Sequence, residues 1–374
     1  MPLTYTLKRV LEDERVPDAT TVAFSPDGLL LATGSSSGRV AIWSVEEGQV
    51  MDTFLGRSAV TALIWKQGGT KQRGSHGFIF IGWHQGDIAV IQVFEGTVRI
   101  EGYLAHDVPV EAIAFKANPM RLATGGSDQV RTWAMTDAPA AKPLHFMSKP
   151  ESTAANAGQA RRVASLHWLD HTEHLLASFV YHGIVMYDAV TSQIVQVLHI
   201  PTMISLSPDN QTIVVHNLNG GFDSYELKTG KLVKEYRPHV PESGSGAILP
   251  FPSLYVHSGS AILGGMPTGA TCWDTADGFI LTTLEHAAGT VQALAAHYID
   301  AKDLFLLATG VSKPSSRDAP IAAHIYQTID MVDESTRRTH CMQAASTAII
   351  HLPFPVPYFV SLLIIAALVL LKMI

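Results

Sequence analysis

The stretch A-T-T-V-A-F-S-P-D-G-L-L-L-A-T-G-S-S-S-G-R-V-A-I-W, residues 19–43, decides the fold. Alternating apolar residues run into the sequence S-P-D-G, a second apolar run meets S-S-S-G, and a third alternating run ends at Trp43. Proline, aspartate, serine and glycine between short apolar runs are typical of tight turns. The stretch therefore predicts three short β-strands joined by two tight turns.

This unit resembles a WD repeat in three places: the F-S-P-D-G turn, the L-A-T-G-S second strand and the I-W end of the third strand. A WD repeat forms one blade of a β-propeller. A single blade cannot bury both of its faces, so the resemblance implies that further copies follow along the chain.

Two positions of the unit recur seven times, at intervals of 38 to 54 residues. This spacing is close to the ~40–45 residues per WD blade, with some loop insertion. The first-strand position holds Phe24, Trp65, Phe115, Trp168, Leu206, Tyr255 and Ala296, and the third-strand end holds Trp43, Ile91, Trp133, Tyr187, Tyr225, Trp273 and Tyr326. The sequence predicts an all-β, seven-bladed WD40-type propeller over residues 1–330. By resemblance, the strand at 3–11 completes the last blade and closes the ring.

Repeat three matches the blade chemistry of the family most fully. His106, Thr124, Asp128 and Trp133 stand where the family places a buried, hydrogen-bonded set of His, Ser/Thr, Asp and Trp. The resemblance implies that these four residues form a structural network. Residues 137–162, rich in alanine and proline, are expected to form a solvated loop.

Composition narrows the classes of partner. The chain has 374 residues, of which 47% are hydrophobic, so it can bury a large core. Its 26 basic and 33 acidic residues give a net charge of −7 with no basic tract, which argues against nucleic acid. The two cysteines, Cys272 and Cys341, lie far apart, which suits a reducing compartment and argues against a thiolate zinc site. We expect no cofactor.

The C-terminal end has a different character. Residues 356–371 carry no charge, and the run reaches 19 residues if Lys372 snorkels, which is near the lower limit for a membrane-spanning helix. We expect a transmembrane helix at 356–374 after a linker at 331–355, with the propeller in the cytosol. This is the layout of a tail-anchored protein, and the endoplasmic reticulum is favoured over the mitochondrial outer membrane. A buried core segment is the competing interpretation.

Two short motifs raise the question of catalysis. Residues 34–38 match G-x-S-x-G, and His171 and His174 have H-x-x-H spacing. A hydrolase nucleophile needs a strand-to-helix turn, and a histidine pair at this spacing needs a helix to bind zinc. Both motifs fall in turns between predicted strands, so we expect neither an enzyme nor a metal site.

The turns between second and third strands lie on the top face of a WD propeller, where partner peptides commonly bind. Here they carry the pairs Trp83-His84, Tyr181-His182 and His216-Asn217, together with the loop at 312–320. Exposed aromatic and histidine side chains around one rim resemble a set of binding hot spots. Packing of Trp83 and Tyr181 between blades is the alternative.

The sequence thus favours a non-catalytic scaffold that binds partner proteins through its top face and is held at an internal membrane. Two alternatives stay open. One is a regulator resembling a membrane-bound propeller that exchanges guanine nucleotide on a small GTPase of coat assembly. The other is a phosphoinositide-binding propeller, suggested by the pair Arg161-Arg162.

Overall fold

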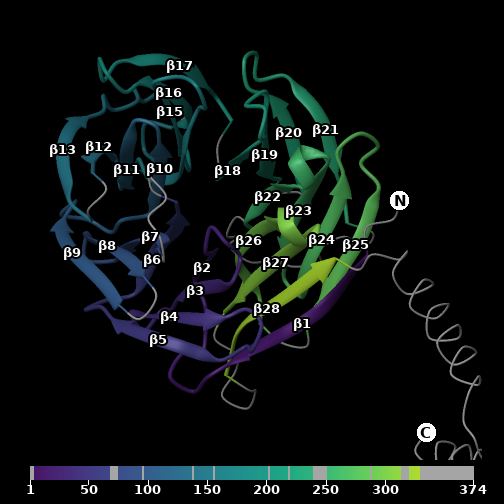
Figure 1. Ribbon diagram of the computed structural model, residues 1–374. Coiled ribbons are helices and arrows are strands. Elements are labelled where there is room, and N and C mark those ends of the chain that lie inside the picture. Colours follow the sequence, from purple (N-terminus) through teal and green to yellow (C-terminus); the bar gives the residue numbers. More distant parts are fainter. Residues whose placement is uncertain are drawn as a thin grey trace, which may run out of the picture. The chain divides into compact units, whose positions relative to one another are not determined.

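Seven four-stranded antiparallel sheets make up the computed structural model, which describes residues 4–67, 75–94, 97–136, 139–154, 156–200, 203–217, 220–238, 251–286, 289–312 and 320–328. Figure 1 shows the sheets following one another around a ring. The predicted all-β fold and the predicted number of seven blades are both confirmed. The only helices in the described residues are two short 3-10 turns, His257–Gly259 and Asp300–Lys302.

Within each blade the strands lie in chain order from the inner to the outer strand, except in blade seven. Blades one to three comprise β2 Thr21–Phe24, β3 Leu30–Gly34, β4 Arg39–Ser44 and β5 Val50–Leu55; β6 Val60–Lys66, β7 Ser75–Trp83, β8 Asp87–Phe94 and β9 Thr97–Leu104; and β10 Ala112–Ala117, β11 Met120–Gly126, β12 Gln129–Met135 and β13 Ala141–Phe146. Blades four to six comprise β14 Val163–Trp168, β15 His174–Phe179, β16 Gly183–Asp188 and β17 Ile194–Leu198; β18 Ile204–Leu206, β19 Thr212–His216, β20 Phe222–Glu226 and β21 Leu232–Tyr236; and β22 Ser253–Val256, β23 Ala261–Met266, β24 Gly269–Asp274 and β25 Ile280–Glu285.

Blade seven is built from both ends of the described chain. Its sheet has the order β1-β28-β27-β26, with β1 Tyr5–Glu12, β26 Val291–Ile299, β27 Leu304–Val311 and β28 Ile321–Thr328. The N-terminal strand β1 is therefore the outer strand, and it pairs antiparallel with β28 from Tyr5 opposite Thr328 to Glu12 opposite Ile321. This pairing closes the ring by hydrogen bonds between the two ends of the propeller.

The predicted register holds in every blade. The first-strand and third-strand positions inferred from the sequence lie opposite one shared residue of the second strand, as Phe24 and Trp43 do across Leu31. Blade seven keeps this pattern although its first-strand residue is only Ala296, opposite Leu307. The shared residues of the seven blades are Leu31, Ile79, Leu122, Leu175, Ile213, Ile262 and Leu307.

The hydrophobic core is divided among the contacts between blades. The described residues form seven apolar clusters, and each cluster draws its side chains from two neighbouring blades. In the cluster between blades seven and one, for example, Leu11 and Leu306 pack with Phe24 and Trp43. Because burial of apolar surface stabilises the contacts rather than the isolated sheets, each blade depends on both of its neighbours.

The structural network of blade three is present with one change of partner. The Trp133 indole donates to Thr124 Oγ1 at 3.0 Å, and His106 Nε2 lies 2.9 Å from the same hydroxyl. Nδ1 of His106 lies 3.3 Å from Gln129 Oε1, whereas Asp128 forms an ion pair with Lys149. The predicted role of Asp128 is therefore wrong, and Gln129 takes its place.

A neutral imidazole fits this network. Burial lowers the pKa of His106, so its ring carries one proton at neutral pH. One arrangement of protons satisfies every polar atom of the network. The His106 Nδ1–H donates to Gln129, and Nε2 accepts from the Thr124 hydroxyl. The oxygen of that hydroxyl accepts from the Trp133 indole. The chain of hydrogen bonds thus ties β11, β12 and the incoming connection of blade three together.

Other blades keep parts of this network. In blade one the Trp43 indole donates to Thr33 Oγ1 at 2.9 Å, and in blade seven His286 Nε2 lies 2.9 Å from Thr309 Oγ1. The ring of His286 stacks on His324 at 4.2 Å between centroids, and burial lowers the pKa of both histidines to about 4. Both rings are therefore neutral at physiological pH.

Two further sequence predictions concern regions beyond these networks. The stretch 137–162 is not a loop throughout, because β13 Ala141–Phe146 pairs with β12 as the outer strand of blade three. The predicted linker at 331–355 and the predicted transmembrane helix at 356–374 lie outside the described residues. Among the residues that are described, no helix is both long and apolar enough to cross a membrane.

Replacing Thr124 with valine tests the blade-three network. Thr124→Val keeps the shape of the side chain but leaves the buried indole N–H and imidazole nitrogen without a partner, so we expect a loss of about 2–4 kcal/mol in the free energy of unfolding. The measurement is chemical denaturation of the full chain, followed by tryptophan fluorescence.

Thr132 on β12 provides the matched control. It is also fully buried, but its hydroxyl has no hydrogen-bond partner within the described part of the chain. Thr132→Val should therefore change the free energy of unfolding little, or raise it. Equal losses in the two variants would show that the Thr124 hydroxyl does not hold the blade.

Candidate protein-binding face

Two sets of loops meet on one face of the propeller. The turn between the second and third strands of a blade hydrogen-bonds to the connection that leads into the next blade. In blade one, Gly56 N donates to Gly38 O and Val60 N donates to Ser35 O, and in blade two Val110 N, in the connection into blade three, donates to Trp83 O. We call this side the top face. It is the face on which the sequence places its candidate binding residues.

Trp83 packs between blades instead of lying exposed on the top face. Its indole lies against the apolar cluster between blades one and two, and a Cβ on Gly56 would meet its Nε1 at 2.0 Å. Glycine at position 56 therefore makes room for the ring. The alternative interpretation, packing between blades, describes Trp83 better than full exposure does.

His182 and His216 are buried, so their predicted exposure is wrong. His216 is 3% exposed, and its ring contacts the edges of Phe222 and of Phe251 from the next blade. His182 is also 3% exposed, and its Nε2 lies 3.5 Å from Ser152 Oγ. Burial lowers the pKa of both imidazoles and keeps them neutral. Both residues support the top face from below rather than forming its surface.

His84 and Tyr181 do lie on the surface. Tyr181 is 51% exposed, and its turn is held from two sides. Asn156 Nδ2 donates to the Tyr181 carbonyl at 3.2 Å, and the neighbouring Val180 N donates to Arg162 O at 2.9 Å. The long connection into blade four thus fixes the backbone beneath an exposed aromatic ring.

The same connection is itself braced by arginine. Arg161 Nε donates to Pro150 O at 3.0 Å, and its Nη2 donates to Ser152 Oγ at 2.8 Å. Arg162 is ion-paired with Glu111. Ser152, Asn156, Arg161, Tyr181 and His182 therefore form one connected unit, which we call the Tyr181 platform. Both arginines of the pair noted in the sequence have partners within the chain.

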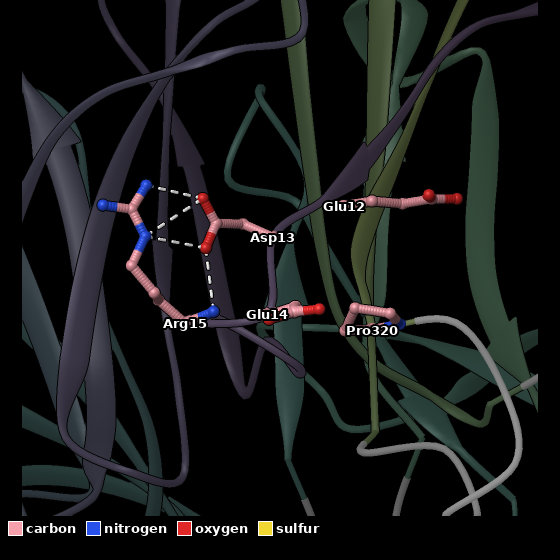
Figure 2. A pocket seen from close by; sticks show the side chains of 5 residues that line it. All are labelled: Glu12, Asp13, Glu14, Arg15 and Pro320. Carbon is pink, nitrogen blue, oxygen red and sulfur yellow. Dashed lines mark hydrogen bonds and ion pairs between the residues drawn. The ribbon is translucent and has the colours of Figure 1, made fainter.

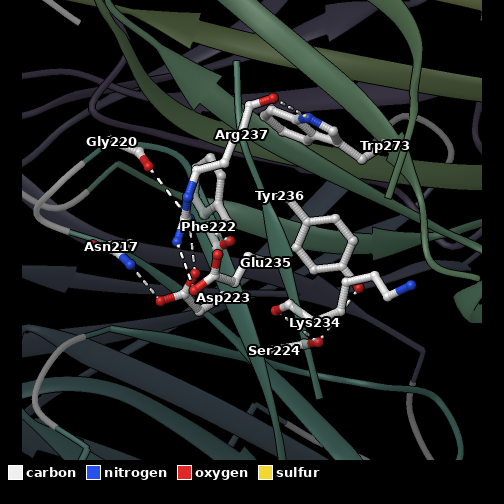
Figure 3. A network of polar contacts seen from close by, with 10 residues as sticks. All are labelled: Asn217, Gly220, Phe222, Asp223, Ser224, Lys234, Glu235, Tyr236, Arg237 and Trp273. Atoms are coloured by element: carbon white, nitrogen blue, oxygen red, sulfur yellow. Dashed lines mark hydrogen bonds and ion pairs between the residues drawn. The ribbon is translucent and has the colours of Figure 1, made fainter. Parts of the chain in front are cut away.

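Asn217 belongs to a charged network in blade five, shown in Figure 3. Its side-chain amide donates to the Asp223 carboxylate, which is ion-paired with Arg237 at 2.8 Å. Arg237 also donates to the Phe222 carbonyl, and its own carbonyl accepts from the Trp273 indole at 3.2 Å. The network thus joins blade five to blade six.

This network was not predicted from the sequence, although the sequence contains one indication of it. Asp223 lies in the strand F-D-S-Y-E, and its side chain is 8% exposed. A carboxylate at an inward strand position requires a cationic partner, because an unpaired buried charge is strongly destabilising. The partner, Arg237, comes directly after the next strand, β21, and could not be identified by spacing.

Acidic side chains line a surface hollow near the ring closure. Figure 2 shows its lining of Glu12, Asp13, Glu14, Arg15 and Pro320. Arg15 pairs with Asp13 at 2.6 Å, and Asp13 N donates to Pro320 O at 3.3 Å. These contacts hold the segment that follows β1. The hollow contains no constellation for acid–base or nucleophilic chemistry beyond these carboxylates.

The two motifs that raised the question of catalysis lie at turns between strands, where Gly34 ends β3 and His174 begins β15. Residues 34–38 join β3 to β4, and Ser36 N lies 3.3 Å from the buried Asp18 carboxylate. His171 precedes β15, and Glu173 of the same turn pairs with Lys116 and Arg121. Among the described residues, no group of three or more His, Cys, Asp or Glu side chains could hold a metal ion.

Comparison with known proteins agrees with this architecture. Residues 5–68 match the family model of the WD40 domain of anaphase-promoting complex subunit 4. The match covers β1, all of blade one and β6, which includes the stretch that decides the fold. A comparison with curated proteins found no match. The family match and the seven four-stranded blades together support a WD40-type propeller.

Proposed function

We propose that this protein is a non-catalytic scaffold that binds partner proteins through its top face, with Tyr181 as the central anchor. The observation that carries the proposal is an exposed tyrosine on a turn whose backbone is fixed by Asn156 and Arg162. Tyrosine is enriched at binding hot spots because it offers a large contact area and a polar tip.

The hydrogen bonds that hold the Tyr181 platform should raise its affinity for a partner protein. Association costs free energy when loops and side chains must be ordered, so a turn that is already held binds more tightly than a free one. The name of the matching family model denotes a subunit of a complex, which also supports an interaction role. Propellers host many functions, however, so the site rather than the fold carries the assignment.

Tyr181→Ala tests the anchor. Loss of a tyrosine hot spot costs about 2 kcal/mol or more, so we expect recovery of the top-face partner to fall by about 30-fold. The measurement is quantitative proximity labelling and affinity purification from cells that express the full chain.

Tyr298 provides the matched control, because it is a similarly exposed tyrosine, 46%, at the end of β26. Tyr298→Ala should leave the recovered proteins unchanged. If the wild type enriches no protein, or if both variants lose the same proteins, the assignment of Tyr181 is wrong.

We further propose that residues 356–374 hold the scaffold on the cytosolic side of an internal membrane. Support comes from the sequence alone: an uncharged run from Val356 to Leu371 with Tyr358 at its start, where an interfacial aromatic residue would stand. The endoplasmic reticulum is the membrane that we favour.

Carbonate extraction of membrane pellets tests the anchor. We expect the full chain to resist extraction and a chain ending at His351 to be released, because only the former keeps the apolar segment. If both chains are released, the segment does not span the bilayer, and the propeller acts without an anchor.

The two alternatives gain no support from the site. Arg161 and Arg162 are both bonded within the chain, and the described top face shows no basic cluster built on that pair. The exchange-factor alternative stays a prediction that a nucleotide-exchange assay against a panel of small GTPases would test.

A further inference from the structure

The outer strand of blade two differs from the other six outer strands. In the described chain, the pairing between the outer strand and its neighbour contains at least one shift of register in blades one, three, four, five, six and seven. The pairing of β9 with β8 has none: eight residue pairs run without interruption from Asp87 opposite Leu104 to Phe94 opposite Thr97. Bulges twist an edge strand away from potential partners, and β9 lacks this protection.

The side chains of β9 also suit pairing, although exposed apolar residues occur on the outer strands β13 and β17 as well. Seven of its eight residues are exposed, and Val98, Ile100 and Leu104 on one face of the strand are 37%, 51% and 68% exposed. The opposite face carries Arg99 and Glu101 between Thr97 and Tyr103. A regular edge with one apolar face favours pairing with another strand, because its outward N–H and C=O groups have no partner in the sheet.

The order of charges on β9 selects the partner. In an antiparallel pairing of β9 with a second β9, centred on Ile100, residue numbers on opposite strands add up to 200. Arg99 then lies opposite Glu101 of the second copy, Glu101 lies opposite Arg99, and Ile100 lies opposite Ile100. We propose that two copies of this chain associate through β9 in this register and join two blades into one eight-stranded sheet.

Several features of β9 fit this arrangement. Opposite charges directly across an antiparallel pair are favourable, and the two-fold axis produces the Arg–Glu contact twice. Gly102 lies opposite Val98 of the second copy, and a Cβ at Gly102 would have only the Ile88 carbonyl within 4 Å, at 4.0 Å, so this position is uncrowded. Figure 1 shows β9 at the outer rim of the ring, away from the central strands. The dimer would therefore leave the Tyr181 platform of each copy accessible.

Disulfide cross-linking tests the register. In Ile100→Cys the two introduced thiols would face each other across the axis, with Cα atoms about 4.5–5.5 Å apart, which is within the range that a disulfide requires. We expect oxidation of the purified full chain to give a covalent dimer. The wild type, which carries Cys272 and Cys341, is the background control.

Leu104→Cys is the matched variant. It lies on the same face and is more exposed than Ile100, but in this register its copies are eight residues apart, roughly 27 Å. It should not cross-link above background. Equal cross-linking of the two variants, or none of Ile100→Cys, would overturn the proposal.

Charge exchange gives an independent test in solution. Arg99→Glu alone and Glu101→Arg alone place like charges opposite each other twice, so we expect the dissociation constant of the dimer to rise roughly tenfold in each. The double variant restores opposite charges and should return to the wild-type value. Sedimentation equilibrium of the full chain in one fixed detergent measures all four proteins.

The remaining outcomes of this experiment also decide the question. A monomer at every concentration overturns the proposal, as does a dimer whose dissociation constant is the same in the wild type and in both single variants. A double variant as weak as the single variants would show that β9 takes part but not in this register, which also overturns it. None of these results bears on Tyr181, so the proposed function is tested separately.

Discussion

Closure of the ring by β1 and β28 is the constraint on which the rest of this structure depends. The strand Tyr5–Glu12 begins the described propeller, yet it pairs with the last described strand and completes blade seven. Leu11 enters the apolar cluster between blades seven and one, and Tyr5 enters the cluster between blades six and seven. Without β1, two of the seven contacts between blades would be incomplete. The arrangement of the top face follows from this closed ring.

The register of the blades could be predicted because it depends on local pattern. Alternation, turn residues and a large third-strand side chain identify each blade even where the first-strand residue is Leu206 or Ala296. Prediction from local pattern failed at two neighbouring residues. Asp128 and Gln129 stand side by side at the start of β12, and spacing alone did not decide which one reaches His106.

Burial on the top face could not be predicted for a related reason. His216 is covered by Phe251 from the following blade, and His182 lies beside Ser152 of the long connection. Both partners come from segments whose course is set by tertiary packing rather than by the turn itself. The pairing of Asp223 with Arg237 is of the same kind. By contrast, the Tyr181 ring is exposed, which is one of the two interpretations that the sequence left open.

A closed ring of packed blades gives a scaffold two useful properties. Its turns are held by hydrogen bonds to the connections between blades, and the Tyr181 turn is held in this way by the connection into its own blade. Its outer strands remain available at the rim, and six of the seven are irregular where they meet their neighbours. In the two proposals above, the partner of the top face and the second copy at β9 would use different surfaces.

Hydrogen–deuterium exchange of the full chain tests the closure of the ring most directly. Mass spectrometry follows the exchange over residues 5–12 and 321–328. If β1 completes blade seven, the amides of both segments should exchange slowly and lose protection together as denaturant is added, because they belong to one cooperative unit. Rapid exchange across residues 5–12 beside a protected β28 would contradict the account, since the ring would then be open at blade seven.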